Sequence, residues 1–143
     1  MDIQFQIQTK ILKPVEEVFE AVVNPAKLSG YFTKSATPMK EGEASLWKFQ
    51  EVPEEFSVHI HKIVRNQLII FEWNSHDSRT RVEMRFEPID KNSTMLRISE
   101  SGWPETQKGL NGSYDNCQGW THMSLCLKAY VEHGINLREG GAF

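Results

Sequence analysis

Two glutamates are the side chains whose positions in this sequence bear most directly on chemistry. Glu72 and Glu100 each lie within an apolar, strand-like run. A carboxylate buried in such a run is neutral or paired, and it could act as a general acid or orient a ligand. We favour the simpler interpretation that each glutamate is exposed at the end of its strand, which would leave it without a chemical role.

Two histidines and two cysteines are the next candidates. His59 and His61 alternate on one face of a predicted strand, an arrangement that binds metal when a third ligand arrives from elsewhere. No second motif supplies that ligand, so we expect ordinary hydrogen-bonded imidazoles and no metal site. Cys117 and Cys126 are separated by about 900° of rotation on a helix. They therefore face opposite sides and cannot form a disulfide, and we expect small apolar fillers rather than reactive thiols.

Nucleophile and phosphate motifs add no further candidate. Ser113 does not lie within a Gly-x-Ser-x-Gly elbow, and no phosphate-cradling glycine loop is present. We therefore predict no catalytic residue, no metal and no cofactor, and we favour a non-enzymatic protein.

A long amphipathic segment near the end of the chain must position most of these residues. Residues 116–137 predict a helix of about six turns. Its apolar residues recur in steps of three and four, which places them on one face: Trp120, Met123, Leu127, Tyr130 and Val131. Since most of the preceding chain predicts strands, this helix must lie across an antiparallel sheet, because neither partner can bury its apolar face alone.

The remaining elements are strands and two short helices. Residues 3–12 alternate apolar and polar side chains, which predicts a half-buried strand. Pro14 at the first helical position begins a short helix with an apolar stripe, and Asn24 caps a second short turn. Strands then follow in a meander of hairpins at residues 44–49, 56–64, 68–73, 79–86 and 94–101.

Three segments leave alternatives open. The strand at residues 68–73 is apolar on both faces, so it is either central in the sheet or covered by a second copy of the chain. Tyr31 and Phe32 follow Gly30 in a loop, where they either pin the loop to the core or contact a ligand. The glycine-rich residues 102–119 predict a long loop, which is either a gate over a cavity or a slack connection.

Length and charge limit the class of protein. With 143 residues, the chain predicts a single domain, 1–143, with one core. A net charge of −3 provides no basic field for the phosphates of a nucleic acid. No run of about 20 apolar residues and no N-terminal signal pattern occur, so we expect a cytoplasmic protein without a membrane segment.

The order of these elements resembles the START-related (SRPBCC) helix-grip fold. Within that group the chain is similar to the family named for the C-terminal domain of the activator of heat-shock protein 90 ATPase. The motifs that carry the resemblance are residues 14–19 with Asn24-Pro25, residues 68–73, residues 94–98 leading to Ser-Gly-Trp-Pro at 101–104, and Gly119-Trp120. The resemblance implies an α+β fold: a curved antiparallel sheet wrapped around a long C-terminal helix, with two short helices after the first strand.

The resemblance and the aromatic content together lead to three functional hypotheses. The first is a monomer or weak homodimer that binds a small apolar or aromatic ligand between the sheet and the terminal helix. The second, implied by the resemblance alone, is an interaction module that activates a chaperone ATPase in a stress response. The third is a cyclase or hydrolase with Glu100 or His61 as acid or base.

The first hypothesis names a set of candidate residues around a small or partly collapsed hydrophobic cavity. The large aromatic content, 8 Phe, 4 Trp and 3 Tyr, is the reason to expect that side chains fill much of the space. The predicted cavity walls are Trp47, Trp73, Met84 and Trp120, and the predicted rim residues are Tyr31, Phe32 and Trp103.

Overall fold

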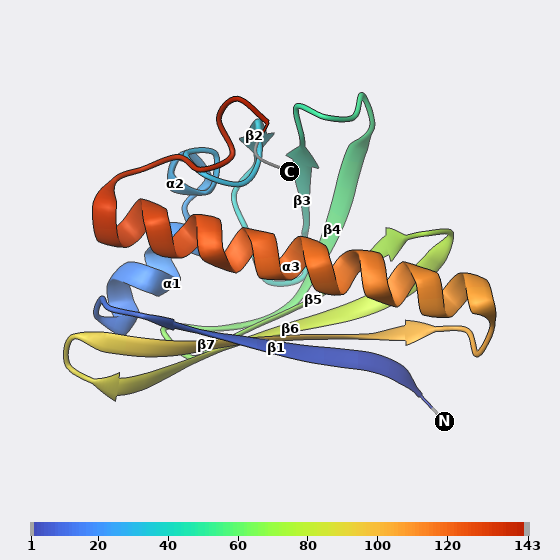
Figure 1. The fold of residues 1–143 in the computed structure, drawn as a ribbon, viewed down its shortest axis with the longest axis horizontal. Coiled ribbons are helices and arrows are strands. Elements are labelled where there is room, and N and C mark those ends of the chain that lie inside the picture. Colours follow the sequence, from blue (N-terminus) through green and yellow to red (C-terminus); the bar gives the residue numbers. More distant parts are fainter. Residues whose placement is uncertain (1, 142–143) are drawn as a thin grey trace.

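The structure, a computed structural model, describes residues 2–141 and shows a sheet with one long helix across it (Figure 1). The elements run in the order β1 (Ile3–Ile11), α1 (Val15–Val23), α2 (Pro25–Leu28), β2 (Ser35–Ala36), β3 (Ala44–Lys48), β4 (Glu55–Val64), β5 (Leu68–Ser75), β6 (Ser78–Asp90), β7 (Ser93–Trp103) and α3 (Gln107–His133). This is the α+β helix-grip fold that the sequence predicted.

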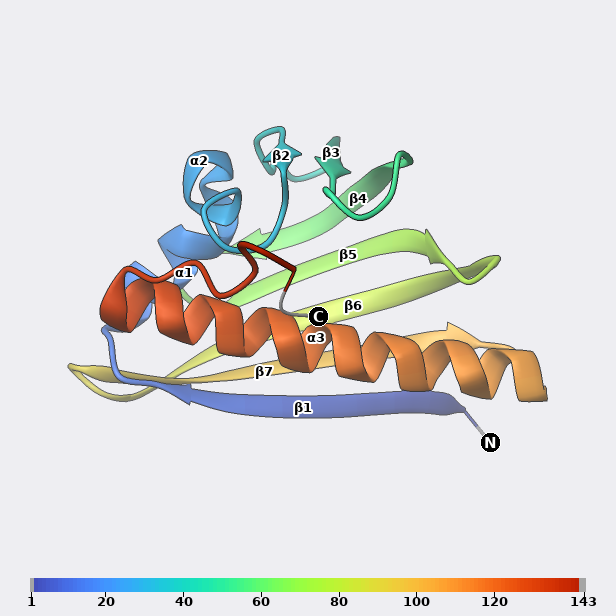
Figure 2. The same cartoon turned by 45° about the horizontal axis from the view of Figure 1, so that its top comes forward.

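The sheet is a continuous meander with its first strand added at the far edge. Within the described residues, seven antiparallel strands pair in the order β1-β7-β6-β5-β4-β3-β2. The strand β5 therefore has three strands on either side, which decides between the two interpretations of its apolar character: it is central. The sheet curves, so that α3 runs along β7 and β1 while β2 and β3 rise beside α2 (Figure 2).

The first third of the chain follows its local sequence signals closely. The strand β1 alternates half-buried and exposed residues along its length, as its pattern predicted. Pro14 is the N-cap of α1 rather than its first residue, a difference of one position, and Glu16 and Glu17 occupy the first turn, where the helix dipole favours carboxylates. The predicted cap at Asn24 is confirmed, because its side-chain oxygen accepts the N–H of Ala26 at 3.0 Å.

The terminal helix is longer than predicted and shifted toward the N-terminus. It spans Gln107–His133, about 40 Å at 1.5 Å per residue, so the predicted range 116–137 and the predicted long loop at 102–119 are both wrong. Thr106 is the N-cap, and its hydroxyl accepts the N–H of Gly109 at 3.0 Å. At the other end Gly134, with a φ of 67°, closes the helix in the left-handed conformation that favours glycine.

The glycines that suggested a loop are the residues that let α3 approach the end of β7. A Cβ atom at Gly109 would lie 2.0 Å from the carbonyl oxygen of Pro104, and one at Gly112 would lie 3.0 Å from the indole nitrogen of Trp103. A glycine costs a helix about 1 kcal/mol relative to alanine. Here close packing offsets that cost, so tertiary contact overrides the low helix propensity of this segment.

Two further properties of α3 bear on chemistry. Cys117 is half-buried and Cys126 is buried, and both are free, as the rotation between them predicted. Burial raises the pKa of the Cys126 thiol, which lowers its reactivity. No helix within residues 2–141 is long and apolar enough to cross a membrane.

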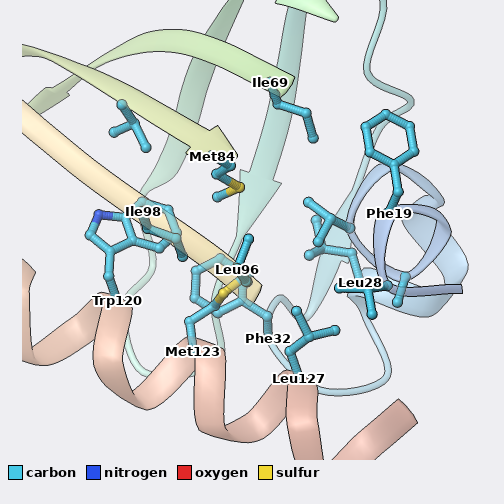
Figure 3. Close-up of a cluster of buried hydrophobic side chains, with 14 of the residues drawn as sticks. Phe19, Leu28, Phe32, Ile69, Met84, Leu96, Ile98, Trp120, Met123 and Leu127 are labelled. Carbon is cyan, nitrogen blue, oxygen red and sulfur yellow. The ribbon is translucent and has the colours of Figure 1, made fainter. Parts of the chain in front are cut away.

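The core lies between α3 and the face of the sheet that it covers. Trp120, Met123 and Leu127 project from the helix toward the side chains of the sheet (Figure 3). A 2.7 Å hydrogen bond between the hydroxyls of Thr9 and Ser124 ties the helix to β1. Alternate residues of β6 and β7 point toward α3 and are all buried: Val82, Met84, Phe86, Leu96 and Ile98.

Candidate functional site

A cavity of about 260 Å³ opens between the second half of the sheet and the middle of α3. It is formed by β4, β5, the loop between β3 and β4, the segment after α2, the helix α3 and the segment that follows α3. Its lining residues are Phe32, Phe49, Glu51, Val52, Phe56, Trp73, Asn116, Gly119, Trp120, His122 and Arg138. A wider surface hollow of about 780 Å³ lies around the β4–β5 turn, but its lining mixes apolar residues with four charged ones, Lys62, Arg65, Arg85 and Glu87. The apolar cavity is therefore the stronger candidate.

Five of the lining residues form a closed circuit of aromatic contacts, which we call the aromatic wall. Going around the circuit, the ring centroids are 5.1 Å apart for Phe32–Phe49, 5.6 Å for Phe49–Phe56, 6.0 Å for Phe56–Trp73, 5.6 Å for Trp73–Trp120 and 5.9 Å for Trp120–Phe32. These distances fall in the range of favourable edge-to-face and offset ring pairs. The wall is therefore an ordered aromatic surface.

Each ring of the aromatic wall comes from a different part of the chain. Phe56 and Trp73 point to the helix-facing side of β4 and β5, while Trp120 lies on the apolar stripe of α3. Phe32 follows α2, and Phe49 follows the last residue of β3. The fold, rather than any local motif, brings these five residues together.

Behind the wall, Glu100 of β7 is buried with 1% of its surface exposed, so the expectation that it is exposed at a strand end is wrong. One carboxylate oxygen accepts hydrogen bonds from the indole N–H of Trp73 at 2.9 Å and the hydroxyl of Thr80 at 2.6 Å. The other accepts the indole N–H of Trp120 at 2.8 Å, and the amide of Asn116 lies 3.1 Å from both oxygens. Within residues 2–141, no Lys, Arg or His forms an ion pair with it.

These hydrogen bonds make Glu100 a clamp for the cavity rather than a part of its surface. Trp73, Trp120 and Asn116 line the cavity, and all three donate to the same carboxylate. An indole N–H can only donate, so an acceptor is required where two indoles converge in a buried place. Glu100 is that acceptor, and it fixes the relative positions of β5, β7 and α3 at the base of the cavity.

The mouth of the cavity carries an ion pair between Arg138 and Glu51. The guanidinium donates two parallel hydrogen bonds to the carboxylate, at 2.9 Å and 3.0 Å. It also lies over the rings of Phe32 and Phe49, at 5.4 Å and 5.3 Å from their centroids. The hydrogen bonds from Arg138 hold the pKa of Glu51 below its ordinary value.

The residues predicted for the site divide into three groups. Phe32, Trp73 and Trp120 line the cavity. Trp47 and Met84 are buried in the core, where Trp47 packs edge-on against Phe32, Phe71 and Trp73. Tyr31 and Trp103 are buried away from the cavity: the Tyr31 hydroxyl donates to the carbonyl of Ala21 at 3.0 Å, and Trp103 stacks on Phe5.

The sequence did not single out Phe49, Phe56, Glu51, Asn116 or Arg138. Phe56 had a detectable signal, because it is the second residue of a strand in which it alternates with Val58 and Ile60 on one face. Arg138 had none, since nothing in the sequence shows that the segment after α3 returns to the loop between β3 and β4.

The other polar candidates lie away from the cavity. Glu72 is half-buried, and its carboxylate lies 3.2 Å from the imidazole of His61 and 3.5 Å from the guanidinium of Arg79. The hydrogen bond to His61 is the main reason why the pKa of Glu72 is lowered. His59 is exposed on the same strand as His61. Within the described part of the chain, no three His, Cys, Asp or Glu side chains are grouped as a metal site would require.

Comparison with known proteins agrees with this architecture. A family described as "Activator of Hsp90 ATPase homolog 1-like protein" matches residues 13–132. No curated protein matches the chain.

Solved structures with the same fold are numerous, and three illustrate the similarity. The protein SSP2350 from Staphylococcus saprophyticus is 24% identical, with a TM-score of 0.78 over 99% of this chain and 100% of its own. MLL2253 from Mesorhizobium loti is 15% identical, with a TM-score of 0.81 over 93% of this chain and 99% of its own. The Aha1 dimer from Colwellia psychrerythraea is 18% identical, with a TM-score of 0.75 over 92% of this chain and 98% of its own.

At these identities the structural similarities establish the fold alone, whereas the family match covers most of the chain, including α1, all of β3–β7 and nearly all of α3. On that match, the chain belongs to the family of Activator of Hsp90 ATPase homolog 1-like proteins.

Proposed function

We propose that this protein binds a small, flat, mostly apolar molecule in the cavity beside the aromatic wall. The observation that carries the proposal is the closed circuit of five rings that lines part of a cavity of about 260 Å³. Binding sites for small molecules are concave and mainly apolar, with a few polar groups that fix orientation. Here the polar lining residues are Arg138 and Glu51 at the mouth, together with Asn116 and His122 of α3.

The cost of the cavity supports an occupant. At about 24 cal/mol per Å³, a void of this size would cost about 6 kcal/mol, which is comparable to the net stability of a domain. Solvent can enter through the mouth, so this figure is an upper bound. Water gains few hydrogen bonds beside five aromatic rings, however, so an apolar ligand stabilises these walls better than water does.

Glu100 supports binding more than acid–base catalysis. It does not line the cavity, and both of its oxygens already accept hydrogen bonds from the chain. His61 lies beside Glu72 and also does not line the cavity. Neither group of the cyclase or hydrolase hypothesis is therefore placed to reach a ligand at the aromatic wall.

Gly119 offers a direct test, because it lines the cavity from α3 and a Cβ atom there meets nothing within 4 Å. Gly119→Leu should extend a side chain into the cavity mouth without displacing the backbone. Gly119→Ala is the matched control, since it gives the helix a Cβ while leaving the cavity open.

The experiment is a thermal-shift screen of aromatic metabolites and lipids against the three proteins. A ligand at a hundredfold excess over its Kd stabilises the folded state by about 2.7 kcal/mol, which raises Tm by about 5–10 °C in a domain of this size. We expect hits for the wild type and Gly119→Ala that are lost for Gly119→Leu. Hits that persist unchanged in Gly119→Leu, or no hit for the wild type, would contradict the proposal.

The family match favours a second candidate, activation of a chaperone ATPase. Turnover by purified heat-shock protein 90, measured with and without a saturating amount of this protein, decides it. An increase that Gly119→Leu retains would show a protein-interaction role independent of the cavity, and an unchanged turnover would remove this candidate.

A further inference from the structure

We propose that Arg138 is the anchor for a carboxylate group on the ligand, and that Glu51 is the carboxylate of this chain that competes for the same guanidinium. This inference rests on the proposed ligand-binding function and narrows it to one chemical class: aromatic or apolar carboxylic acids. It follows from the position of the Arg138–Glu51 pair, from its geometry and from its exposure.

The position of Arg138 is set by the chain that carries it. Gly134 ends α3 and turns the backbone, and the side-chain oxygen of Asn136 accepts the N–H of Arg138 at 3.0 Å. The guanidinium is thereby held over Phe32 and Phe49, two members of the aromatic wall. An apolar body against the wall would place its polar end at this guanidinium.

The Arg138–Glu51 pair also separates two hollows of different character. On one side lies the apolar cavity, and on the other lies a polar hollow of about 200 Å³. Arg138, Glu51 and Phe32 line both, and Lys34 lines the polar side. A carboxylate that replaced that of Glu51 would therefore meet Arg138 beside a polar compartment whose lining includes both Lys34 and Glu139, while its apolar body remained at the aromatic wall.

The geometry of the pair matches what a carboxylate ligand would need. A planar guanidinium presents two parallel N–H groups to the two oxygens of a carboxylate, and Glu51 already uses this arrangement at 2.9 Å and 3.0 Å. Glu51 thus shows, with a residue of this chain, that a carboxylate is accommodated at this place with good hydrogen-bond geometry.

Exposure makes Glu51 replaceable. Its side chain is 44% exposed and that of Arg138 is 24% exposed, so water can solvate the Glu51 carboxylate once it leaves the guanidinium. Glu51 also lies in the loop between β3 and β4, so it can leave Arg138 without breaking a sheet hydrogen-bond ladder.

The test compares two probes that differ in charge and hardly in shape, 2-naphthoate and its neutral amide, 2-naphthamide. Their Kd values are measured by isothermal titration calorimetry at pH 7 for the wild type, Glu51→Gln, Arg138→Gln and the control Glu55→Gln. Glu55 is matched to Glu51, because its side chain is also 44% exposed and ion-paired, with Lys48, but it does not line the cavity.

We expect Glu51→Gln to tighten naphthoate binding about fivefold, because the competing carboxylate is lost, and to leave naphthamide binding unchanged. Glu55→Gln should change neither probe, although it alters the net charge by the same amount. Arg138→Gln should weaken naphthoate binding at least as strongly as Glu51→Gln tightens it, again with little effect on naphthamide.

Two results would overturn the inference, and they differ in what they say about the cavity. If naphthoate and naphthamide bind equally well and respond equally to all three variants, the carboxylate anchor is refuted while the proposed cavity stands. If neither probe binds any of the proteins, both the carboxylate anchor and the binding of an aromatic molecule at the aromatic wall are refuted.

Discussion

Replacing Glu100 by glutamine is the perturbation that most directly tests how the base of the cavity is held together. The substitution keeps the size of the side chain and exchanges one carboxylate oxygen for an NH₂ group. The partners of Glu100 are N–H and O–H donors, so the new NH₂ group would face other donors instead of an acceptor. Only 1% of the residue is exposed, so water cannot replace the lost acceptor.

The magnitude follows from the hydrogen bonds of each oxygen. If the glutamine oxygen takes the position beside Trp73 and Thr80, its NH₂ group faces the indole N–H of Trp120. Asn116 could turn its amide to accept from the NH₂ group, but the Trp120 N–H would remain without a partner. A buried donor left unpaired costs about 1–3 kcal/mol, and hydrogen bonds to a charged acceptor are stronger than those to a neutral one.

One effect opposes this loss, because a neutral side chain no longer bears the cost of burying a charge. This gain in stability is small here, because four side chains donate hydrogen bonds to the carboxylate. The neutral amide cannot accept from all four. We therefore expect Glu100→Gln to lower the free energy of unfolding by about 2–4 kcal/mol.

The assay is urea denaturation followed by far-ultraviolet circular dichroism, because tryptophan emission would respond directly to the changed contacts of Trp73 and Trp120. The control is Glu83→Gln on β6, where the carboxylate is more exposed and forms only surface ion pairs with Arg81 and Arg85. It should cost less than about 1 kcal/mol. Equal stability of Glu100→Gln and the wild type would refute the description of Glu100 as a clamp.

A double-mutant cycle with Trp120→Phe separates the hydrogen bond from the packing of the indole. Trp120→Phe removes the N–H donor and some buried surface, and the surface is lost equally whether residue 100 is glutamate or glutamine. The substitution should cost less in the Glu100→Gln background, where the N–H is already unpaired. Strictly additive costs would show that the hydrogen bond contributes nothing.

Two further predictions concern stability elsewhere in the fold. Gly109→Ala should lower the free energy of unfolding, measured in urea, by more than about 2 kcal/mol, because its Cβ would overlap the Pro104 carbonyl. Gly119→Ala, whose Cβ meets nothing, should raise it by about 1 kcal/mol. Equal effects of the two substitutions would contradict the packing explanation. Burial raises the pKa of Tyr31 well above its ordinary value, so above about pH 10 the unfolded chain loses a proton that the folded chain keeps, and stability falls. Tyr31→Phe should cost about 1 kcal/mol at pH 7 through the lost hydrogen bond to Ala21 but should lose less stability than the wild type between pH 9 and 11, and parallel curves would contradict this.

Short-range patterns in the sequence were sufficient for most of the architecture. Three such patterns depend only on side chains within a few residues of one another. They are the period-two alternation in β1, β6 and β7, the cap at Asn24, and the apolar stripe of Trp120, Met123 and Leu127. The order from β2 to β7 follows because consecutive hairpins pair neighbours, whereas the place of β1 beside β7 does not follow from that rule. These features led to the correct fold, with strand ends within a few residues of those observed.

The start of α3 shows where local reasoning fails. Three glycines between residues 109 and 119 lower the helix propensity of that segment, so the sequence indicated a loop. The cause of the helix there lies outside the segment, in the Pro104 carbonyl and the Trp103 ring that only a glycine surface can approach. No pattern within the helix itself contains that information.

The site depended still more on tertiary structure. Trp73 and Trp120 were plausible cavity walls from the sequence, because bulky residues on the inward faces of the sheet and the helix must meet, and Phe32 was a plausible rim residue. The sequence did not indicate that four donors converge on Glu100, because they lie 16 to 27 residues away from it in the chain. It also did not indicate that Arg138 pairs with Glu51, which lies 87 residues before it. Periodicity reports which face of an element is buried, whereas the identity of a buried group's partner is settled only when separate elements pack.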